Sequence, residues 1–387
     1  MIGKLASQHL TVVVLLANTS FTIILIDVSE RIIMNKTRTA NNNIEVPLAK
    51  NRLNKAGLTQ ARFLQAMLLG GIFCISGMSS AAMNSYQYCS TDGCRDGGKQ
   101  LQLSTYAKTK YPIVLAHGAS GFSAIGGIYD YFYGIPQDLS RAGANVYVAQ
   151  MAALNNSDIR GEQLLQQVED IVAITGAQKV NLIGHSHGSQ AIRYVAGLVP
   201  QHVASVTSVG GPNMGSPVAD QLLPVLEKNS TISSLLVTPL NAFLKLVGIS
   251  SGKAYEQDAL GSLDALTSAS ATTFNARFPQ GIPSQYCGNG ASKVNGINYY
   301  SWSGAGTYTN PLNPASPLLA ATGLLIKEPS DGLVPSCSSH LGQVIRDDYY
   351  QNHLDEVNQV MGLVSVFTPD PVQLYRQQAN RLKGVGL

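Results

Sequence analysis

The chain has few charged residues and no cluster of basic ones. Only 13% of its 387 residues are charged, the formal net charge is +3, and lysine and arginine are scattered. A nucleic-acid-binding surface is therefore not indicated, because such surfaces need a concentrated basic patch. Paired C-x-x-C spacings are also lacking, which argues against a structural zinc site. Internal repeats and long polar low-complexity tracts are absent too, and 45% of the residues are apolar, enough for the core of one large or two medium domains.

The first 82 residues differ in composition from the rest. The apolar stretch 64–78 follows several basic residues and precedes the small residues Ser80, Ala81 and Ala82. This order is typical of a secretory signal peptide, so we predict a targeting region over 1–82, cleavage after Ala82 and export of the remainder. The alternative is a buried core helix. An earlier apolar run, 10–26, is either an anchor or the product of an upstream start codon.

Four cysteines remain outside the apolar stretch that contains Cys74. An even number of cysteines in an exported chain indicates disulfides, and four of them allow three pairings. Cys89 and Cys94 are close enough for a small local loop, which would leave Cys287 with Cys337.

Strands and helices alternate from residue 111 onward, after a polar, glycine-rich stretch over 83–110 that we expect to be an extension preceding the fold. Apolar runs predict strands over 111–118, 144–151, 179–184 and 203–212. Helical spacing predicts helices over 161–176 and 189–200. Such alternation indicates an α/β fold with a mostly parallel sheet and helices on both faces.

The segment Gly184-His185-Ser186-His187-Gly188 matches G-x-S-x-G between a predicted strand and a predicted helix. In that setting the serine lies on a sharp turn, and glycines leave room for the neighbouring backbone. We predict that Ser186 is a nucleophile. The alternative is a glycine-rich turn with an incidental serine.

A serine nucleophile needs a base and an acid that orients the base, and in this fold the acid comes before the histidine. Asp331 follows an apolar, strand-like run over 318–326 and precedes Gly332, a good position at the top of a loop. It is our predicted acid. Asp347 and Asp348 are the other candidates.

Two histidines further along compete for the role of base. We favour His353, which lies in a separate polar loop, over His340, which would be tethered if Cys337 forms a disulfide. His185 and His187 are too close in sequence to Ser186 to reach back over it.

An oxyanion hole needs two backbone N–H groups. One would come from His187, the residue after the nucleophile. The loop HGASGF (117–122) follows the first predicted core strand and would supply the other from Ala119. The alternative is a plain tight turn.

Several long motifs resemble one known family. They are YPIVLAHG, RGEQLLQQVE, KVNLIGHSHG, YYSWSG, SDGLVPSCSSHLGQVIRDDYYQNHLDEVNQVMGL and YRQQANRLKG. From about Lys110 to the C-terminus the chain is similar to the secreted triacylglycerol lipases of Pseudomonas, Burkholderia and their relatives, which are α/β hydrolases. The resemblance implies a triad of Ser186, Asp331 and His353 and oxyanion donors at Ala119 and His187, where Ala119 replaces a usually bulkier residue.

The resemblance also implies a Cys287–Cys337 disulfide and a structural calcium ion near the catalytic histidine. The ligands would be the Asp355 side chain, the backbone oxygens of Gln359 and Leu363, and a second acidic position that reads Asn313 here. Losing one carboxylate predicts a weaker site, because ligand charge tunes calcium affinity. A helical lid over 221–255 and a periplasmic foldase are implied as well; the alternative for 221–255 is a buried helix pair.

We therefore expect a secreted lipase of the α/β-hydrolase fold over 111–387 that acts on long-chain acylglycerols at a lipid–water interface. The first alternative is a carboxylesterase acting on shorter soluble esters. The second is a non-catalytic binding protein on the same scaffold, against which the complete Ser, Asp and His set argues.

Overall fold

The computed structural model describes residues 10–17, 20–27, 82–229, 247–251 and 253–387. The chain forms two compact units, Met1–Gly77 and Met78–Leu387. In the first unit, β1 (Leu10–Ala17) and β2 (Ser20–Asp27) pair antiparallel. The apolar stretch 64–78, predicted to be part of a signal peptide, lies outside the described residues. None of the helices in the described ranges is long and apolar enough to cross a membrane.

The second unit is built on a nine-stranded sheet with the order β11-β12-β10-β9-β5-β8-β3-β4, in which β13 also pairs with β12. The pairs β11–β12 and β3–β4 are antiparallel and the other neighbours are parallel. The strands are β3 (Met83–Ser90), β4 (Gly93–Leu101), β5 (Ile113–Ala116), β8 (Val146–Ala149), β9 (Val180–His185), β10 (Val203–Val209), β11 (Lys293–Val294), β12 (Ile297–Gly304) and β13 (Gln343–Tyr349).

Every residue of β5, β8, β9 and β10 is buried. Parallel strands of this kind are covered on both faces, which is why they appear in the sequence as continuous apolar runs. The four strands predicted over 111–118, 144–151, 179–184 and 203–212 are confirmed, with small differences at their ends.

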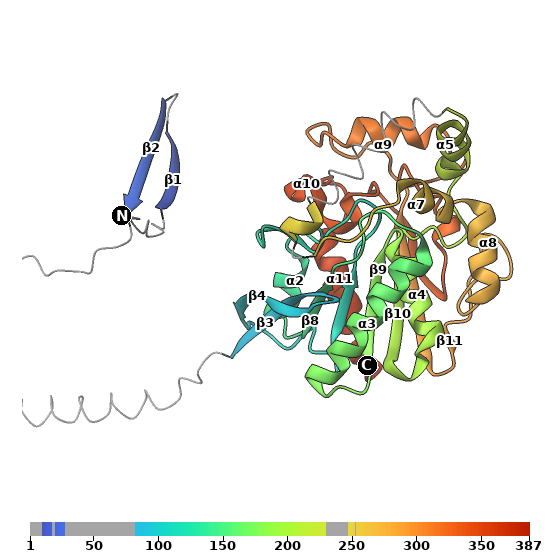
Figure 1. Cartoon of the computed structure of the whole chain (residues 1–387), viewed down its shortest axis with the longest axis horizontal. Coiled ribbons are helices and arrows are strands. Elements are labelled where there is room, and N and C mark those ends of the chain that lie inside the picture. The colour runs from blue at the N-terminus through green and yellow to red at the C-terminus, as the bar shows by residue number, and fades with distance from the viewer. Residues whose placement is uncertain (1–9, 18–19, 28–81, 230–246, 252) are drawn as a thin grey trace, which may run out of the picture. The chain divides into compact units, whose positions relative to one another are not determined.

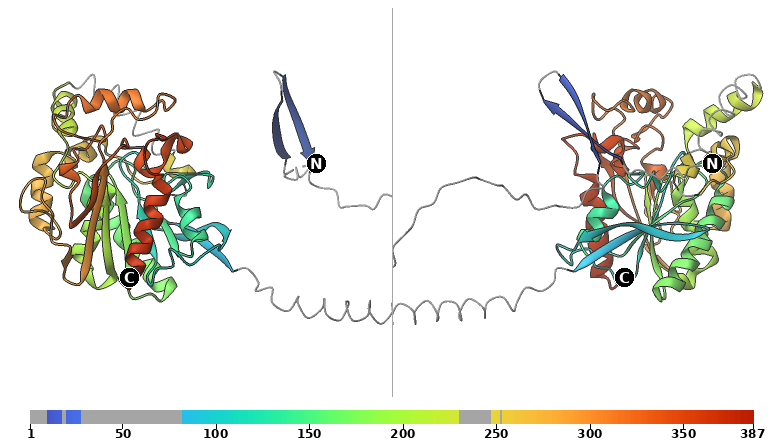
Figure 2. Two further views of the ribbon diagram at one scale, coloured as in Figure 1. Left: turned by 180° about the vertical axis from the view of Figure 1, so that it is seen from behind. Right: turned by 60° about the vertical axis from the view of Figure 1, so that its left-hand side comes forward.

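Helices cover both faces of the sheet, as the views from two sides show (Figure 1, Figure 2). On one face, α2 (Ile135–Arg141) and α11 (Pro371–Gly384) bury Leu139 and Tyr375. On the other, α3 (Ser157–Thr175) and α4 (Gly188–Leu198) bury Leu164 and Val195. The two predicted helices correspond to α3 and α4, and the predicted α/β class is confirmed.

Further helices gather at the end of the sheet where β5, β9 and β10 finish (Figure 1). They are α5 (Pro217–Lys228), α7 (Ala259–Ala265) and α9 (Ser316–Gly323), with α8 (Ser268–Arg277) beside them. Of the predicted lid over 221–255, residues 230–246 and 252 lie outside the described residues. Within the described part, Pro224 lies inside α5 and does not end it.

Two predictions about local structure were wrong. Residues 83–101 are no extension before the fold, because they form the β3–β4 hairpin and β3 pairs with β8. Their polar composition reflects a position at the edge of the sheet, where β3 buries only part of its side chains and β4 none fully. The strand-like run 318–326 falls largely in the helix α9, which starts with a proline in its first turn.

Both disulfides form as the cysteine spacing suggested. Cys89 pairs with Cys94 at the tip of the β3–β4 hairpin, and Cys287 pairs with Cys337. The first joins neighbouring strands, whereas the second joins segments that are 50 residues apart.

Candidate active site

Ser186 occupies a sharp turn between β9, which ends at His185, and α4, which begins at Gly188. Its φ of 55° is in the left-handed region, which residues other than glycine seldom adopt. A Cβ on Gly184 would lie 2.5 Å from the carbonyl oxygen of Gly188, and a Cβ on Gly188 would clash with Ala116. The two glycines are therefore required for the turn, and strain of this kind is concentrated at functional sites.

His353 and Asp331 form a buried pair. The distance between Nδ1 of His353 and Oδ2 of Asp331 is 2.7 Å, and the backbone N–H of His353 donates to the carbonyl oxygen of Asp331 at 2.9 Å. The other Asp331 oxygen accepts from the N–H groups of Leu333 and Val334, both at 2.8 Å. Asp331 therefore holds the imidazole through Nδ1, which leaves Nε2 available to accept a proton.

Ser186 and His353 line one cavity of about 460 Å³. Its walls are mainly apolar and come from the helices at the carboxyl end of the sheet, with Val218, Ala219 and Leu222 from α5, Leu263 from α7, and Leu318 and Leu319 from α9. A larger surface hollow of about 620 Å³, lined by residues such as Arg141 and Arg376, contains neither Ser186 nor His353.

Ala119 lines the same cavity from the loop 117–123 after β5, termed here the β5 loop. Within the described part of the chain, the N–H groups of Ala119 and His187 donate to no protein acceptor. The buried guanidinium of Arg160 donates to the carbonyl oxygens of His117 and Gly118 at 2.6 and 3.2 Å. These two hydrogen bonds hold the start of the β5 loop in place. Burial lowers the pKa of Arg160 to about 10.

The other candidates named from the sequence lie elsewhere. Nε2 of His340 is 2.9 Å from Asp347, its Nδ1 is 2.8 Å from the carbonyl oxygen of Gly288, and it does not line the cavity. Asp348 pairs with Arg346 at the surface. His187 contacts the hydroxyls of Ser157 and Ser262. The structure thus brings together Ser186, Asp331 and His353, whereas His340, Asp347 and Asp348 do not line the cavity.

Residues 111–339 match the family model of the alpha/beta hydrolase fold. A Vibrio cholerae protein named triacylglycerol lipase is 55% identical over 288 residues, which cover 74% of this chain and 92% of the relative. Proteins of the same name from Pseudomonas fragi and Burkholderia plantarii are 43% and 42% identical; the alignments cover 72% and 74% of this chain and 98% and 90% of those relatives.

The chain belongs to the triacylglycerol lipase family of α/β hydrolases.

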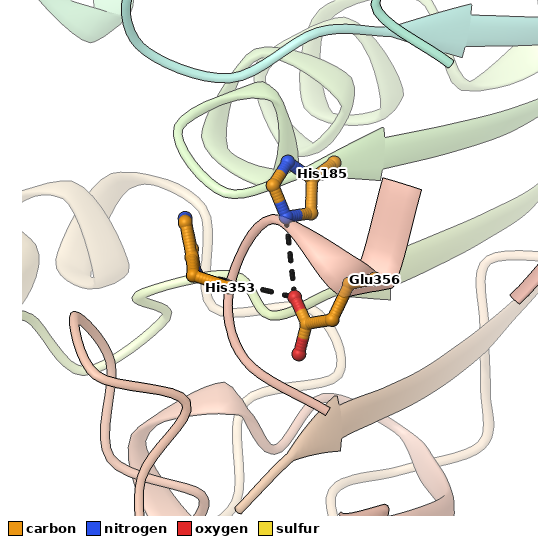
Figure 3. A group of neighbouring side chains, drawn as sticks. All are labelled: His185, His353 and Glu356. Atoms are coloured by element: carbon orange, nitrogen blue, oxygen red, sulfur yellow. Dashed lines mark hydrogen bonds and ion pairs between the residues drawn. The ribbon is translucent and has the colours of Figure 1, made fainter. Parts of the chain in front are cut away.

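In this family member a second carboxyl group, which the sequence reading missed, lies beside the base (Figure 3). Oε2 of Glu356 is 3.1 Å from Nε2 of His185 and 4.0 Å from Nδ1 of His353, and Oε1 accepts from the N–H of Gly304 at 2.6 Å. Burial raises the pKa of Glu356 and lowers that of His185, so the buried site disfavours the charged form of each group.

Tyr131 extends this group of side chains to the β5 loop. Its hydroxyl lies 2.7 Å from Nδ1 of His185, and it lines the cavity. Glu356 was detectable only as an acidic residue three positions after His353, whereas Tyr131 and Arg160 gave no signal in the sequence, because their partners are distant along the chain.

The four residues assigned to calcium by resemblance lie around one loop of this lipase-family protein. Oδ2 of Asp355 accepts from Thr309 at 2.5 Å, while its Oδ1 is buried and has no hydrogen-bond partner among the described residues. Burial raises the pKa of Asp355 to about 6. The Asn313 amide donates to the carbonyl oxygen of Leu363 at 3.1 Å. Gln359 lies between Asp355 and Leu363 in the sequence.

Proposed function

We propose that the protein is a secreted triacylglycerol lipase that hydrolyses long-chain acylglycerol esters through a Ser186–His353–Asp331 triad. The observation that carries this proposal is the meeting of a strained serine turn and a buried His–Asp pair in the wall of an apolar cavity. Pockets lined by apolar side chains with a few convergent polar groups are typical ligand sites. An acyl chain fits this description because only its ester end is polar.

The reaction proceeds in two halves. Nε2 of His353 takes the proton of the Ser186 hydroxyl while Oγ attacks the ester carbonyl carbon, and Asp331 stabilises the imidazolium that forms. His353 then gives the proton to the leaving glycerol oxygen, which releases the alcohol and leaves an acyl-enzyme. Water attacks the acyl-enzyme by the same route and frees the fatty acid.

The charge that develops on the carbonyl oxygen would be held by the N–H groups of Ala119 and His187. Neither donates to an acceptor among the described residues, which suits donors that act only when substrate is present. Removing one such donor typically costs about 10²–10³ in kcat. Because Ala119 is small, it also leaves more room for the acyl chain than a bulkier residue would.

Calcium would bind through Asp355, Asn313 and the backbone oxygens of Gln359 and Leu363. Oδ1 of Asp355 is buried and has no hydrogen-bond partner among the described residues, which fits a cation, since a buried carboxylate oxygen without a donor is costly. Asn358, Val360 and Met361, with φ of 58°, 58° and 56°, lie among these residues. A bound ion would supply charge that holds this strained loop, which follows His353.

The remaining parts of the proposal concern how the enzyme is made. The signal-like residues 64–78 support export with cleavage after Ala82, which the mass of the protein recovered from culture medium would check. The family resemblance supports folding with a periplasmic foldase and a lid over 221–255. Leu222 of that segment lines the cavity.

Labelling with a serine-directed phosphonate tests the triad. We expect the reagent to modify Ser186 in the wild type and His353→Ala to abolish this reaction. The matched control is His340→Ala, which removes the rival histidine and should leave labelling unchanged. Loss of labelling in His340→Ala alone, or modification of another serine, would overturn the assignment.

A further inference from the structure

Two side chains of the β3–β4 hairpin contact the segments that surround the β5 loop, although the hairpin does not line the cavity. Tyr88 and Arg95 face each other across the hairpin, next to the pair Cys89 and Cys94. The Arg95 guanidinium lies 4.8 Å from the centre of the Tyr88 ring. The disulfide between Cys89 and Cys94 therefore fixes the two strands directly beside this pair.

Tyr88 supports the segment that leads to Tyr131. Its hydroxyl donates to Oδ1 of Asp130, and Gln137 donates to Oδ2 of the same carboxyl group. Asp130 is buried, and burial raises its pKa, so its carboxylate depends on these two donors. Losing the Tyr88 hydroxyl would leave Asp130 poorly satisfied and would allow it to move.

Tyr131 follows Asp130 directly and packs against the β5 loop. A Cβ on Gly118 would lie 2.7 Å from both the Tyr131 hydroxyl and Cβ of Ser186, so all three groups are in close contact. Ala119 is the next residue. A shift of Asp130 would therefore reach Gly118 and the proposed oxyanion donor through Tyr131.

Arg95 supports the far end of the same loop. Its Nη2 donates to the carbonyl oxygen of Ser251 at 3.1 Å, and the hydroxyl of Ser123 donates to that same oxygen at 3.2 Å. Ser123 is also held through its N–H, which donates to Gln150 at 2.5 Å. The hairpin and the β5 loop thus share one acceptor.

We propose that the disulfide-closed β3–β4 hairpin is a positioning device for the β5 loop, with Tyr88 and Arg95 as its positioning residues. This inference rests on the proposed function, since the effect it predicts is on the Ser186 reaction. The apolar walls of the cavity come mainly from α5, α7 and α9, so the hairpin affects the rate of acyl transfer more than substrate binding.

The test compares Tyr88→Phe and Arg95→Ala with two control variants. Asn84→Ala removes two hydrogen bonds from β3 to the carbonyl oxygens of Ser140 and Ala144, away from the cavity. Lys253→Met breaks the exposed pair between Lys253 and Asp92 at the hairpin tip. For each protein, kcat and KM on a soluble ester, the rate of phosphonate labelling and the thermal midpoint are measured.

We expect Tyr88→Phe and Arg95→Ala to lower kcat and the labelling rate by about tenfold or more, because small misplacements of catalytic groups are costly. KM should stay within about twofold of the wild type. Arg95→Lys should recover part of the rate, since an ammonium group can still donate to Ser251 and lie over Tyr88. Both control variants should keep the wild-type kcat even where the thermal midpoint falls.

Wild-type kcat in Tyr88→Phe and Arg95→Ala, with only the thermal midpoint lowered, would overturn the proposal and leave the hairpin a structural element. If Arg95→Ala does not fold, Tyr88→Phe decides, because it removes a single oxygen atom. Failure of the proposed function can be distinguished from failure of this inference, because in that case the phosphonate would not label Ser186 even in the wild type.

Discussion

At the residue scale, His353 has two carboxyl groups near its Nδ1, that of Asp331 at 2.7 Å and that of Glu356 at 4.0 Å. Glu356 is buried against the imidazole ring of His185, close enough to His353 for us to expect that it can partly replace Asp331. We therefore predict that Glu356 is a reserve acid, which the reaction does not need while Asp331 is present.

We expect Asp331→Ala to lose about a hundredfold in kcat and the double variant Asp331→Ala/Glu356→Gln to lose about ten-thousandfold, the loss typical of a triad without a working acid. Glu356→Gln alone should lose less than about tenfold, because Asp331 still orients the base. The measurement is kcat in a double-mutant cycle. A double variant no slower than Asp331→Ala would contradict a reserve role for Glu356.

His117 makes stability depend on pH. Burial and the nearby charge of Arg160 lower its pKa to about 3, from 6.5 in the unfolded chain. Between these values the unfolded state binds more protons, so the free energy of unfolding falls as the pH falls. His117→Gln should reduce this slope by up to about 1.4 kcal/mol per pH unit. Denaturant unfolding across this pH range measures the slope of the free energy of unfolding against pH. An unchanged slope in His117→Gln would show that His117 does not cause the pH dependence.

The residues that the sequence predicted at the site are those with local signals. Ser186 lies in a short motif between a strand and a helix, and Asp331 and His353 follow it in the order that the fold requires. Tyr131 and Arg160 were missed because each acts through partners far away in the sequence. Arg160, for example, holds the carbonyl oxygen of His117 from 43 positions away.

At the element scale, the two disulfides have different consequences. The Cys287–Cys337 bond spans 50 residues and the Cys89–Cys94 bond spans 5. By chain entropy the first contributes about 4 kcal/mol and the second about 2 kcal/mol to the free energy of unfolding. The short one, however, lies beside Tyr88 and Arg95.

We therefore expect Cys287→Ala/Cys337→Ala to destabilise the protein more and Cys89→Ala/Cys94→Ala to lower kcat more. Urea unfolding gives the first comparison. Steady-state rates at a temperature where both variants are folded give the second. The reverse order in kcat would argue against a link between the hairpin and the site.

The loop after His353 contains three of the four predicted calcium ligands, Asp355, Gln359 and Leu363. Asn313→Asp adds a carboxylate to the ligand set and should tighten calcium binding by about tenfold or more. Isothermal titration of calcium-stripped protein measures this, with Asp355→Asn as the variant that should lose binding. Submicromolar binding by the wild type would contradict the expected weak site.

Elements were predictable where burial was continuous. The central strands are buried throughout, so they appear in the sequence as continuous apolar runs that predict strands. The β3–β4 hairpin was missed because Tyr86, Tyr88 and Cys89 become buried only through long-range packing, beside β8. The run 318–326 was ambiguous because short apolar stretches suit a strand or a helix equally well.

At the scale of the whole molecule, the second unit presents its cavity at the carboxyl end of the sheet. Leu318 of α9 and Leu222 of α5 line this cavity and are 65% and 40% exposed. Exposed apolar residues around a site suit a substrate that is itself an apolar phase. This arrangement favours an emulsified lipid over a small soluble ester.

The most direct test is hydrolysis of a long-chain and a short-chain triglyceride emulsion by the wild type and by Ser186→Ala. We predict that the wild type hydrolyses the long-chain emulsion readily and that the variant loses at least about ten-thousandfold of this rate, since the nucleophile is gone. Activity on short soluble esters alone would make the protein a carboxylesterase. Long-chain hydrolysis that survives in Ser186→Ala would contradict the account.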